Sequence, residues 1–196
     1  MRKARGLIPA LLLSHAIAFG QEASAIQTPT LGIHYIFNDF KTPVYLKTSS
    51  LGEVIRSKRF GKLKDMESGL ALSYIQGLSK HIDFTSTLIG SFTDYPTSEG
   101  VFTGQDNLLL EADASIRAKM FSNKYWVTPF IQVGTGVSSY NASWGAFIPA
   151  GIGFQLNFFD EAFLLFNAQY RIPVTENVSH HFFYSIGLAG NIGKKK

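Results

Sequence analysis

Hydrophobic and polar residues alternate along most of this chain with a period of two. The clearest case is residues 108–120, LLLEADASIRAKM, in which one row of alternate residues is wholly apolar from Leu108 to Met120. The charges of this stretch all lie in the other row, at Glu111, Asp113, Arg117 and Lys119. A period of two is typical of a β-strand whose two faces meet different surroundings. The pattern in the rest of the chain is needed to infer which face is buried.

Eight segments of this kind follow one another, separated by clusters of Gly, Asn, Asp and Ser. We expect strands at 30–40, 67–78, 82–94, 107–121, 125–139, 143–159, 161–174 and 180–193. A helical period is suggested only in the stretch 50–60, so the fold class is all-β. Prolines 129, 149 and 173 fall inside expected strands and cannot donate to a ladder, so we place them near strand ends or bulges.

The lengths of the connections predict how these strands are arranged. The gaps after the first and third strands, 41–66 and 95–106, are long, whereas those after the second, fourth and sixth strands are short. Short turns on one rim and longer loops on the other are typical of an antiparallel up-and-down transmembrane barrel. With an even strand number, both termini lie on the rim of the short turns. We therefore predict an eight-stranded barrel over residues 30–193.

Two closed barrels fit the alternation: a soluble barrel with its apolar row around a ligand, and a membrane barrel with that row against lipid. The row opposite the apolar one is rich in small and polar residues, which suits a narrow lumen filled with side chains. Aromatic residues gather near strand ends, as an interfacial girdle requires. They are Tyr125, Trp126, Tyr140, Trp144, Phe158, Phe159, Phe182 and Tyr184. We favour the membrane barrel, with charges inside.

The N-terminus predicts export. Arg2, Lys3 and Arg5 precede a short apolar run ending in small residues, the pattern of a signal peptide over 1–20 with cleavage after Gly20 or as late as Ala25. Removing it lowers the net charge from +4 to +1, so the high pI does not indicate a nucleic-acid partner. No later apolar run reaches the roughly 20 residues of a helical membrane span.

The strand and turn pattern of residues 30–193 resembles the N-terminal barrel of OmpA-type outer-membrane proteins of Gram-negative bacteria, most specifically in the blocks KYWVTPF, NFFDEAFL and NAQYRIPVTE. The resemblance implies a monomeric eight-stranded barrel in the outer membrane, usually followed by a peptidoglycan-binding domain. This sequence ends in GNIGKKK, where residues 194–196 could begin a linker. We expect either a barrel-only relative or a chain cut before that domain, and peptidoglycan contact only if the domain follows.

The inner row supplies the first candidate site, a polar network in the lumen. Its members are Glu111, Asp113, Arg117, Lys119, Gln155, Asn157, Asn167, Gln169 and Arg171. These side chains could form a salt-bridge gate in a small pore, or a structural plug whose charges satisfy one another. We favour the plug, because an eight-stranded barrel leaves room only for side chains.

The first long loop supplies the second candidate site. Residues 41–66 hold seven basic and two acidic residues. Such a patch could bind the phosphates of lipopolysaccharide at the outer surface. The candidate residues are Arg56, Lys58, Arg59, Lys62 and Lys64. A solvated loop containing a short helix is the alternative.

Catalysis is not expected. The sequence has no cysteine, which excludes a thiol nucleophile, a thiolate metal site and a disulfide framework. It has no phosphate-binding loop, metal-ligand cluster or haem motif, so no cofactor is expected. His34, His81, His180 and His181 with Ser185 raise the alternative of a lipid A-modifying barrel enzyme, but none of these histidines stands two residues from Ser185 on one face. We expect a structural envelope protein in contact with outer-membrane lipid, with loops available for adhesion.

Overall fold

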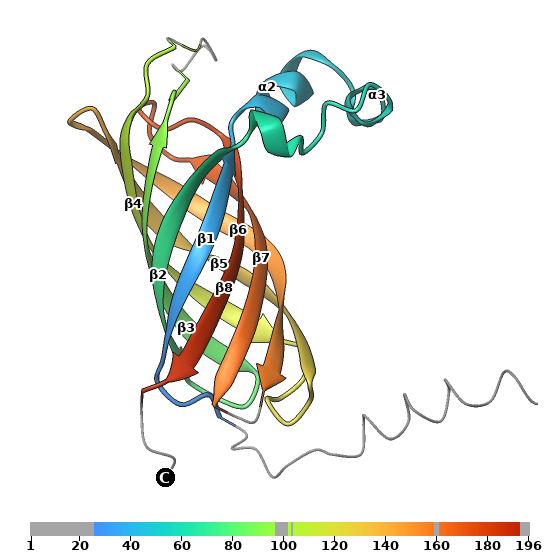
Figure 1. Cartoon of the computed structure of the whole chain (residues 1–196), viewed down its shortest axis with the longest axis vertical. Coiled ribbons are helices and arrows are strands. Elements are labelled where there is room, and N and C mark those ends of the chain that lie inside the picture. Colours follow the sequence, from blue (N-terminus) through green and yellow to red (C-terminus); the bar gives the residue numbers. More distant parts are fainter. Residues whose placement is uncertain (1–25, 97–101, 103, 159–160, 193–196) are drawn as a thin grey trace, which may run out of the picture.

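The computed structural model describes residues 26–96, 102, 104–158 and 161–192, and its eight strands close into a barrel (Figure 1). The strands are β1 (Thr30–Asp39), β2 (Glu67–Gly77), β3 (Ile82–Thr93), β4 (Asn107–Lys119), β5 (Val127–Tyr140), β6 (Ser143–Phe158), β7 (Ala162–Pro173) and β8 (His181–Asn191). All eight expected strands are present, each end within two residues of its predicted position. The expected signal peptide, residues 1–25, and the tail 194–196 lie outside the described residues.

Each strand pairs antiparallel with the next, and β1 also pairs with β8, which closes the sheet. The closing pair runs from Thr30 opposite Asn191 to Asp39 opposite Phe182. A closed sheet has no free strand edge, so every strand finds hydrogen-bond partners on both sides. The predicted all-β, eight-stranded up-and-down barrel is therefore confirmed.

The two long loops lie on one rim, as the connection lengths predict. The β1–β2 and β3–β4 connections lie at the upper rim in Figure 1, and the turns after β2 and β4 and both ends of the described chain lie at the lower rim. The upper rim also carries the two-residue β5–β6 turn, so the division by length holds only for the two long loops. The first loop folds into α2 (Lys41–Thr48), α3 (Leu51–Arg56) and a short 3-10 helix, η1 (Leu63–Asp65). It projects sideways from the rim, beyond the barrel wall (Figure 1).

Local chemistry explains the helices of the first loop. Ser50 caps α3 by accepting a hydrogen bond from the Glu53 backbone N–H at 3.3 Å, which is half of a capping box. This helix lies within the expected stretch 50–60. The helix α2 was not expected, because its residues show little amphipathic period. Its Pro43 lies in the first turn, where the missing N–H costs nothing. No helix in the described part of the chain is long and apolar enough to cross a bilayer.

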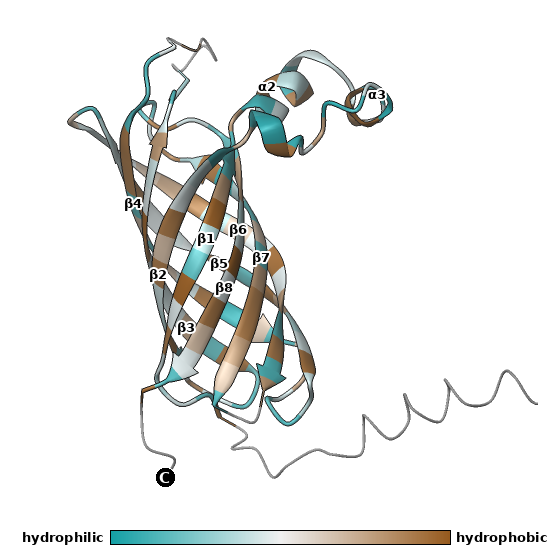
Figure 2. Ribbon diagram, viewed as in Figure 1, coloured by the Kyte–Doolittle hydropathy of each residue, from teal (hydrophilic) through white to brown (hydrophobic). Residues whose placement is uncertain are grey.

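The two faces of the wall have opposite chemistry. Outward side chains are apolar and accessible, with Ile33 at 65%, Ile152 at 64% and Leu188 at 68% exposure, whereas the inward Glu111 and Arg171 are at 1% and 0%. Apolar positions recur along the wall, while the lower turns are mostly hydrophilic (Figure 2). A band of exposed aliphatic residues around the whole wall is unfavourable in water and suits hydrocarbon. The charged row of residues 108–120 is therefore the inner one.

The prolines are only partly where we expected them. Pro173 ends β7 and Pro129 is near the start of β5, but Pro149 lies in the middle of β6, and no bulge accommodates it. The β5–β6 pairing stops at Val133 opposite Ala150 and resumes in the same register at Gly136 opposite Phe147. The barrel tolerates this proline by interrupting one ladder, because Pro149 has no N–H to donate.

Candidate functional site

Arg171 is the centre of an upper charge cluster inside the barrel. Its guanidinium donates to a Glu111 carboxylate oxygen and lies 3.5 Å from Asp113 Oδ2. The same group lies over the rings of Phe183 and Phe147, 4.0 and 4.9 Å from their centroids. Burying an arginine without partners is costly, and here two carboxylates and two aromatic faces replace water.

His181 extends this cluster toward the loops. Its Nε2 lies 3.7 Å from Glu111 Oε1, and its Nδ1 is 3.0 Å from the backbone oxygen of Ser179. A ring nitrogen facing a carbonyl oxygen donates to it, so Nδ1 bonds to Ser179, and Nε2 has no hydrogen-bond partner in the described residues. His181 therefore places the first residue of β8 beside the charge cluster of β4 and β7 without a hydrogen bond to it.

A second charge cluster lies nearer the turn rim. Lys119 Nζ is 2.9 Å from Asp83 Oδ1 and donates to Asn123 Oδ1 at 3.0 Å. Arg117 Nε donates to Gln132 at 3.3 Å, and its guanidinium lies 4.6 Å from the Phe130 centroid. Asp83 is fully buried and was not among the residues expected in the lumen. The alternation of 82–93 would have placed it in the inner row.

Amide side chains close the turn-side end of the lumen. Gln27 Oε1 accepts from Asn123 at 2.6 Å and from Gln155 at 3.3 Å. Gln155 in turn donates to Asn157 at 2.6 Å, and Asn157 donates to the backbone oxygen of Tyr125. This chain of amides ties the segment before β1 to the β4–β5 turn and to β6. It forms a plug at the lower rim.

The other two polar residues expected in the lumen also face inward, but the structure does not connect them to either charge cluster. The side-chain oxygens of Asn167 and Gln169 are buried and have no hydrogen-bond partner in the described part of the chain. Between the clusters, His34 Nε2 lies 2.7 Å from Ser73 Oγ.

The lumen is less polar than the sequence suggested. Two groups of buried apolar side chains fill the space between the polar clusters, in contrast to an inner row of small and polar residues. They are Ile36, Ala71, Ile89 and Phe183 in one group, and Ile75, Phe163, Leu165 and Ala189 in the other. The barrel interior is thus a packed core with embedded ion pairs.

Aromatic residues cover the loop-side end of the lumen. Phe40, Tyr95 and Leu109 form a buried cluster, and Tyr140 stacks on Tyr95 with ring centroids 4.9 Å apart. The expectation that Tyr140 belongs to the interfacial girdle is wrong, because its place in the inner row of β5 turns it toward this cap. Trp126 and Trp144 are exposed at the two rims, at 61% and 66%, as a girdle requires. Phe159 lies outside the described residues.

The Tyr95 hydroxyl ties the cap to a second loop. It accepts a hydrogen bond from the Ser179 backbone N–H at 2.7 Å, and the Ser179 hydroxyl donates to the Pro96 carbonyl oxygen at 2.9 Å. Burial raises the pKa of the Tyr95 phenol above its ordinary value. The β3–β4 and β7–β8 loops are therefore joined over the barrel mouth.

The first loop presents its basic residues to solvent. Arg56, Lys58, Arg59 and Lys64 are exposed, and Lys62 is half-buried. The same loop exposes large apolar side chains, namely Leu51, Ile55, Phe60 and Leu63. Phe60 packs on the outward Phe182 of β8, with ring centroids 5.7 Å apart. The basic surface is therefore fixed to the outside of the barrel.

The histidines do not form a lipid-facing catalytic pair. His34 and His181 point into the lumen, as does Ser185. His180 lies at the loop rim, 3.0 Å from the Tyr170 hydroxyl, and burial lowers the pKa of its imidazole. In the described ranges, no three His, Cys, Asp or Glu residues are grouped as metal ligands.

A closed eight-stranded sheet with an apolar outer wall and a charged, packed interior defines a membrane-spanning β-barrel. No protein-family model and no curated protein matches the sequence. Among solved structures, Neisserial surface protein A (NspA) is similar over 88% of this chain and 100% of its own, with 12% identity and a TM-score of 0.52. At this identity the similarity shows the fold, which is the barrel that the OmpA-type resemblance implied.

Two other solved barrels are similar at lower scores. The N-terminal β-barrel domain of Pseudomonas aeruginosa OprF has 10% identity over 84% of this chain and 98% of its own, with a TM-score of 0.48. Ail, the attachment invasion locus protein of Yersinia pestis, has 11% identity over 83% of this chain and 95% of its own, with a TM-score of 0.46.

Proposed function

We propose that this protein is a structural, non-catalytic barrel of the bacterial outer membrane that stabilises the cell envelope and holds its loops at the surface for adhesion. The observation that carries the proposal is the filled lumen. Arg171 with Glu111, Lys119 with Asp83, and the amides around Gln27 occupy successive levels of the interior. A barrel whose interior is used for packing is suited to stability rather than to transport.

The orientation follows from the fold. In transmembrane barrels of this kind the short turns face the periplasm and the longer loops face outward. The first loop and the joined β3–β4 and β7–β8 loops would then be displayed on the cell surface. The signal-peptide pattern of residues 1–20 supports export across the inner membrane.

Two other functions have less support. A lipid A-modifying enzyme needs its reactive groups on the lipid side, but the hydrogen-bonded His34 and Ser73 are at 4% and 2% exposure inside the barrel. A pore needs an open path, and the lumen is filled by ion pairs, amides and two groups of buried apolar side chains. The enzyme would change the acylation of lipid A, and the pore would conduct ions across a planar bilayer, whereas a structural barrel would do neither.

The decisive experiment compares cells that have and lack the protein. A structural role predicts that the loss increases sensitivity to detergents and large antibiotics, and that lipid A keeps its acylation pattern by mass spectrometry. The unboiled protein of the outer-membrane fraction should migrate differently from the boiled protein on a denaturing gel. A changed lipid A, or recovery of the protein as a detergent-free soluble monomer, would contradict the proposal.

A further inference from the structure

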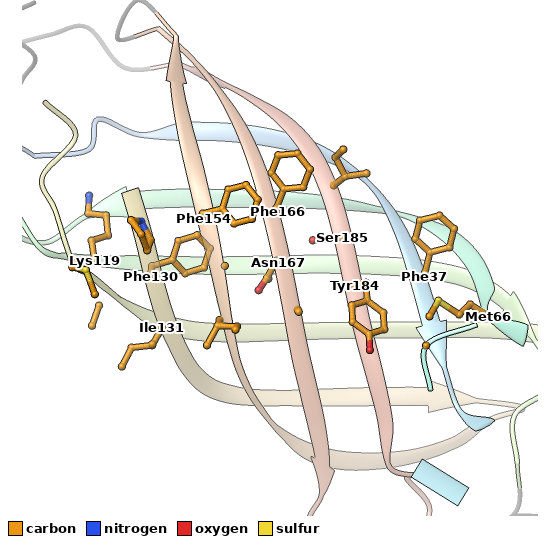
Figure 3. A pocket seen from close by; sticks show the side chains of 18 of the residues that line it. Phe37, Met66, Lys119, Phe130, Ile131, Phe154, Phe166, Asn167, Tyr184 and Ser185 are labelled. Atoms are coloured by element: carbon orange, nitrogen blue, oxygen red, sulfur yellow. The ribbon is translucent and has the colours of Figure 1, made fainter. Parts of the chain in front are cut away.

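The outer wall of the barrel contains an apolar groove of about 980 Å³. It crosses β5 to β8, where outward residues line it together with inward residues that stand between them, such as Phe130, Asn167 and Ser185 (Figure 3). The outward residues of the lining include Ile131, Ile152, Phe154, Phe166, Tyr184 and Ile186. Ala168 of β7 also lines the groove, and its small side chain leaves room between the larger neighbours. A concave apolar surface on a lipid-facing wall fits a hydrocarbon chain.

The first loop forms the upper end of this groove. Phe60, Gly61, Leu63 and Met66 line it there, next to Phe37 of β1. The stacking of Phe60 on Phe182 fixes the loop against β8. Leu63 is 68% exposed, so this side of the loop presents an apolar surface at the rim of the membrane. The groove therefore runs from the hydrocarbon to the headgroup level.

Positive charge lies at that upper end. Lys62 and Lys64 flank the groove-lining Leu63, and the whole loop 41–66 has seven basic and two acidic residues. Lys64 is exposed and Lys62 is half-buried, and lysines beside apolar side chains are typical of a segment lying in the membrane interface. A ligand that matches both the apolar groove and the lysines at its upper end has an acyl chain and a phosphate-bearing headgroup.

We propose that this groove and loop form a binding site for one lipopolysaccharide molecule, with an acyl chain along β6–β8 and a phosphate at Lys62 and Lys64. The choice of lipid rests on the proposed function, since the loop rim then faces the outer leaflet. Several phosphates on one molecule match the density of basic residues in the loop. The bound lipid would stay with the barrel when bulk lipid is removed.

The test uses the full chain purified from outer membranes in mild detergent, with lipopolysaccharide and phospholipid quantified per barrel. Ala168→Trp fills the groove, and Ala114→Trp places the same side chain on the exposed outer face of β4 as its control. The double variant Lys62→Glu/Lys64→Glu removes the charges, and Lys80→Glu/Lys124→Glu makes the same charge change at the turn rim.

Both site variants should lower retained lipopolysaccharide by about fivefold or more, consistent with the loss of two charge contacts or of the chain pocket, while both controls keep it. Equal retention in site and control variants would overturn the proposal. So would phospholipid, or a second copy of the barrel, recovered in place of lipopolysaccharide. The gel shift and the envelope resistance of the same variants test the structural function separately. If both are unchanged and no lipopolysaccharide is lost, the proposed binding site is contradicted and the structural function is not.

Discussion

Lys119 Nζ lies 2.9 Å from Asp83 Oδ1, and both side chains are almost inaccessible to solvent. The pair joins β4 to β3 inside the barrel, next to Arg117, whose charge has no carboxylate within an ion-pair distance in the described residues. Asp83 therefore compensates positive charge that the lumen cannot solvate. Removal of either charge would leave the other buried without its partner.

Asp83→Ala should destabilise the barrel by about 3 kcal/mol or more, because it leaves Lys119 buried without its carboxylate partner. The measurement is urea unfolding in lipid vesicles or detergent. The double variant Asp83→Asn/Lys119→Met should recover much of this loss, since it removes both charges. A single variant as stable as the wild type would show that the pair contributes little.

Arg171→Ala tests whether the upper cluster is a gate. It should lower the unfolding free energy by about 3 kcal/mol, because Glu111 and Asp113 lose their shared cation. Channel conductance in a planar bilayer should stay at the level of the wild type, since Phe147 and Phe183 still fill this level. Arg117→Ala should likewise leave conductance unchanged. A clear rise in conductance for either variant would favour the gate.

Gly187→Ala should destabilise the barrel by about 1–3 kcal/mol, because a Cβ at Gly187 would overlap the imidazole ring of His34. The ring would have to move away from Ser73, its hydrogen-bond partner. Gly90→Ala is the matched control: it lies in a strand too, but its nearest neighbour is Leu110 Cδ2 at 3.8 Å. If the two variants unfold at the same urea concentration, His34 is not held as described.

Tyr95→Phe removes the acceptor of the Ser179 N–H and should cost about 1 kcal/mol. Because burial raises the pKa of Tyr95 in the folded barrel, its neutral form contributes stability that is complete below the unfolded pKa of about 10. This contribution is lost as pH rises above that value toward the folded pKa. The difference in stability between wild type and variant should therefore shrink above pH of about 10. If the difference in unfolding free energy stayed constant across this pH range, the Tyr95 phenol would not be buried as described.

The sequence predicted the strands and the polarity of the wall because both depend on a local period of two. It placed the lumen residues on the inner face for the same reason. It could not predict that Arg171 meets Glu111 while Gln169 has no partner, since contacts across a lumen depend on strand stagger. The cap was also missed: Tyr140 belongs to the inner row, and only the neighbouring Tyr95 shows why an aromatic residue is needed there.

The two ends of the barrel sheet meet at Thr30 and Asn191, whose side chains are hydrogen-bonded at 2.8 Å across a sequence separation of 161 residues. This contact cannot form until the last strand has been made. The chain loses loop-closure entropy before it gains the β1–β8 hydrogen bonds that close the barrel. Assembly is therefore expected to be slow. Throughout that delay the chain carries open strand edges and uncovered aliphatic rows, which favour aggregation in water. Until the two ends of the sheet have met, these rows must therefore be kept out of water if the chain is not to aggregate.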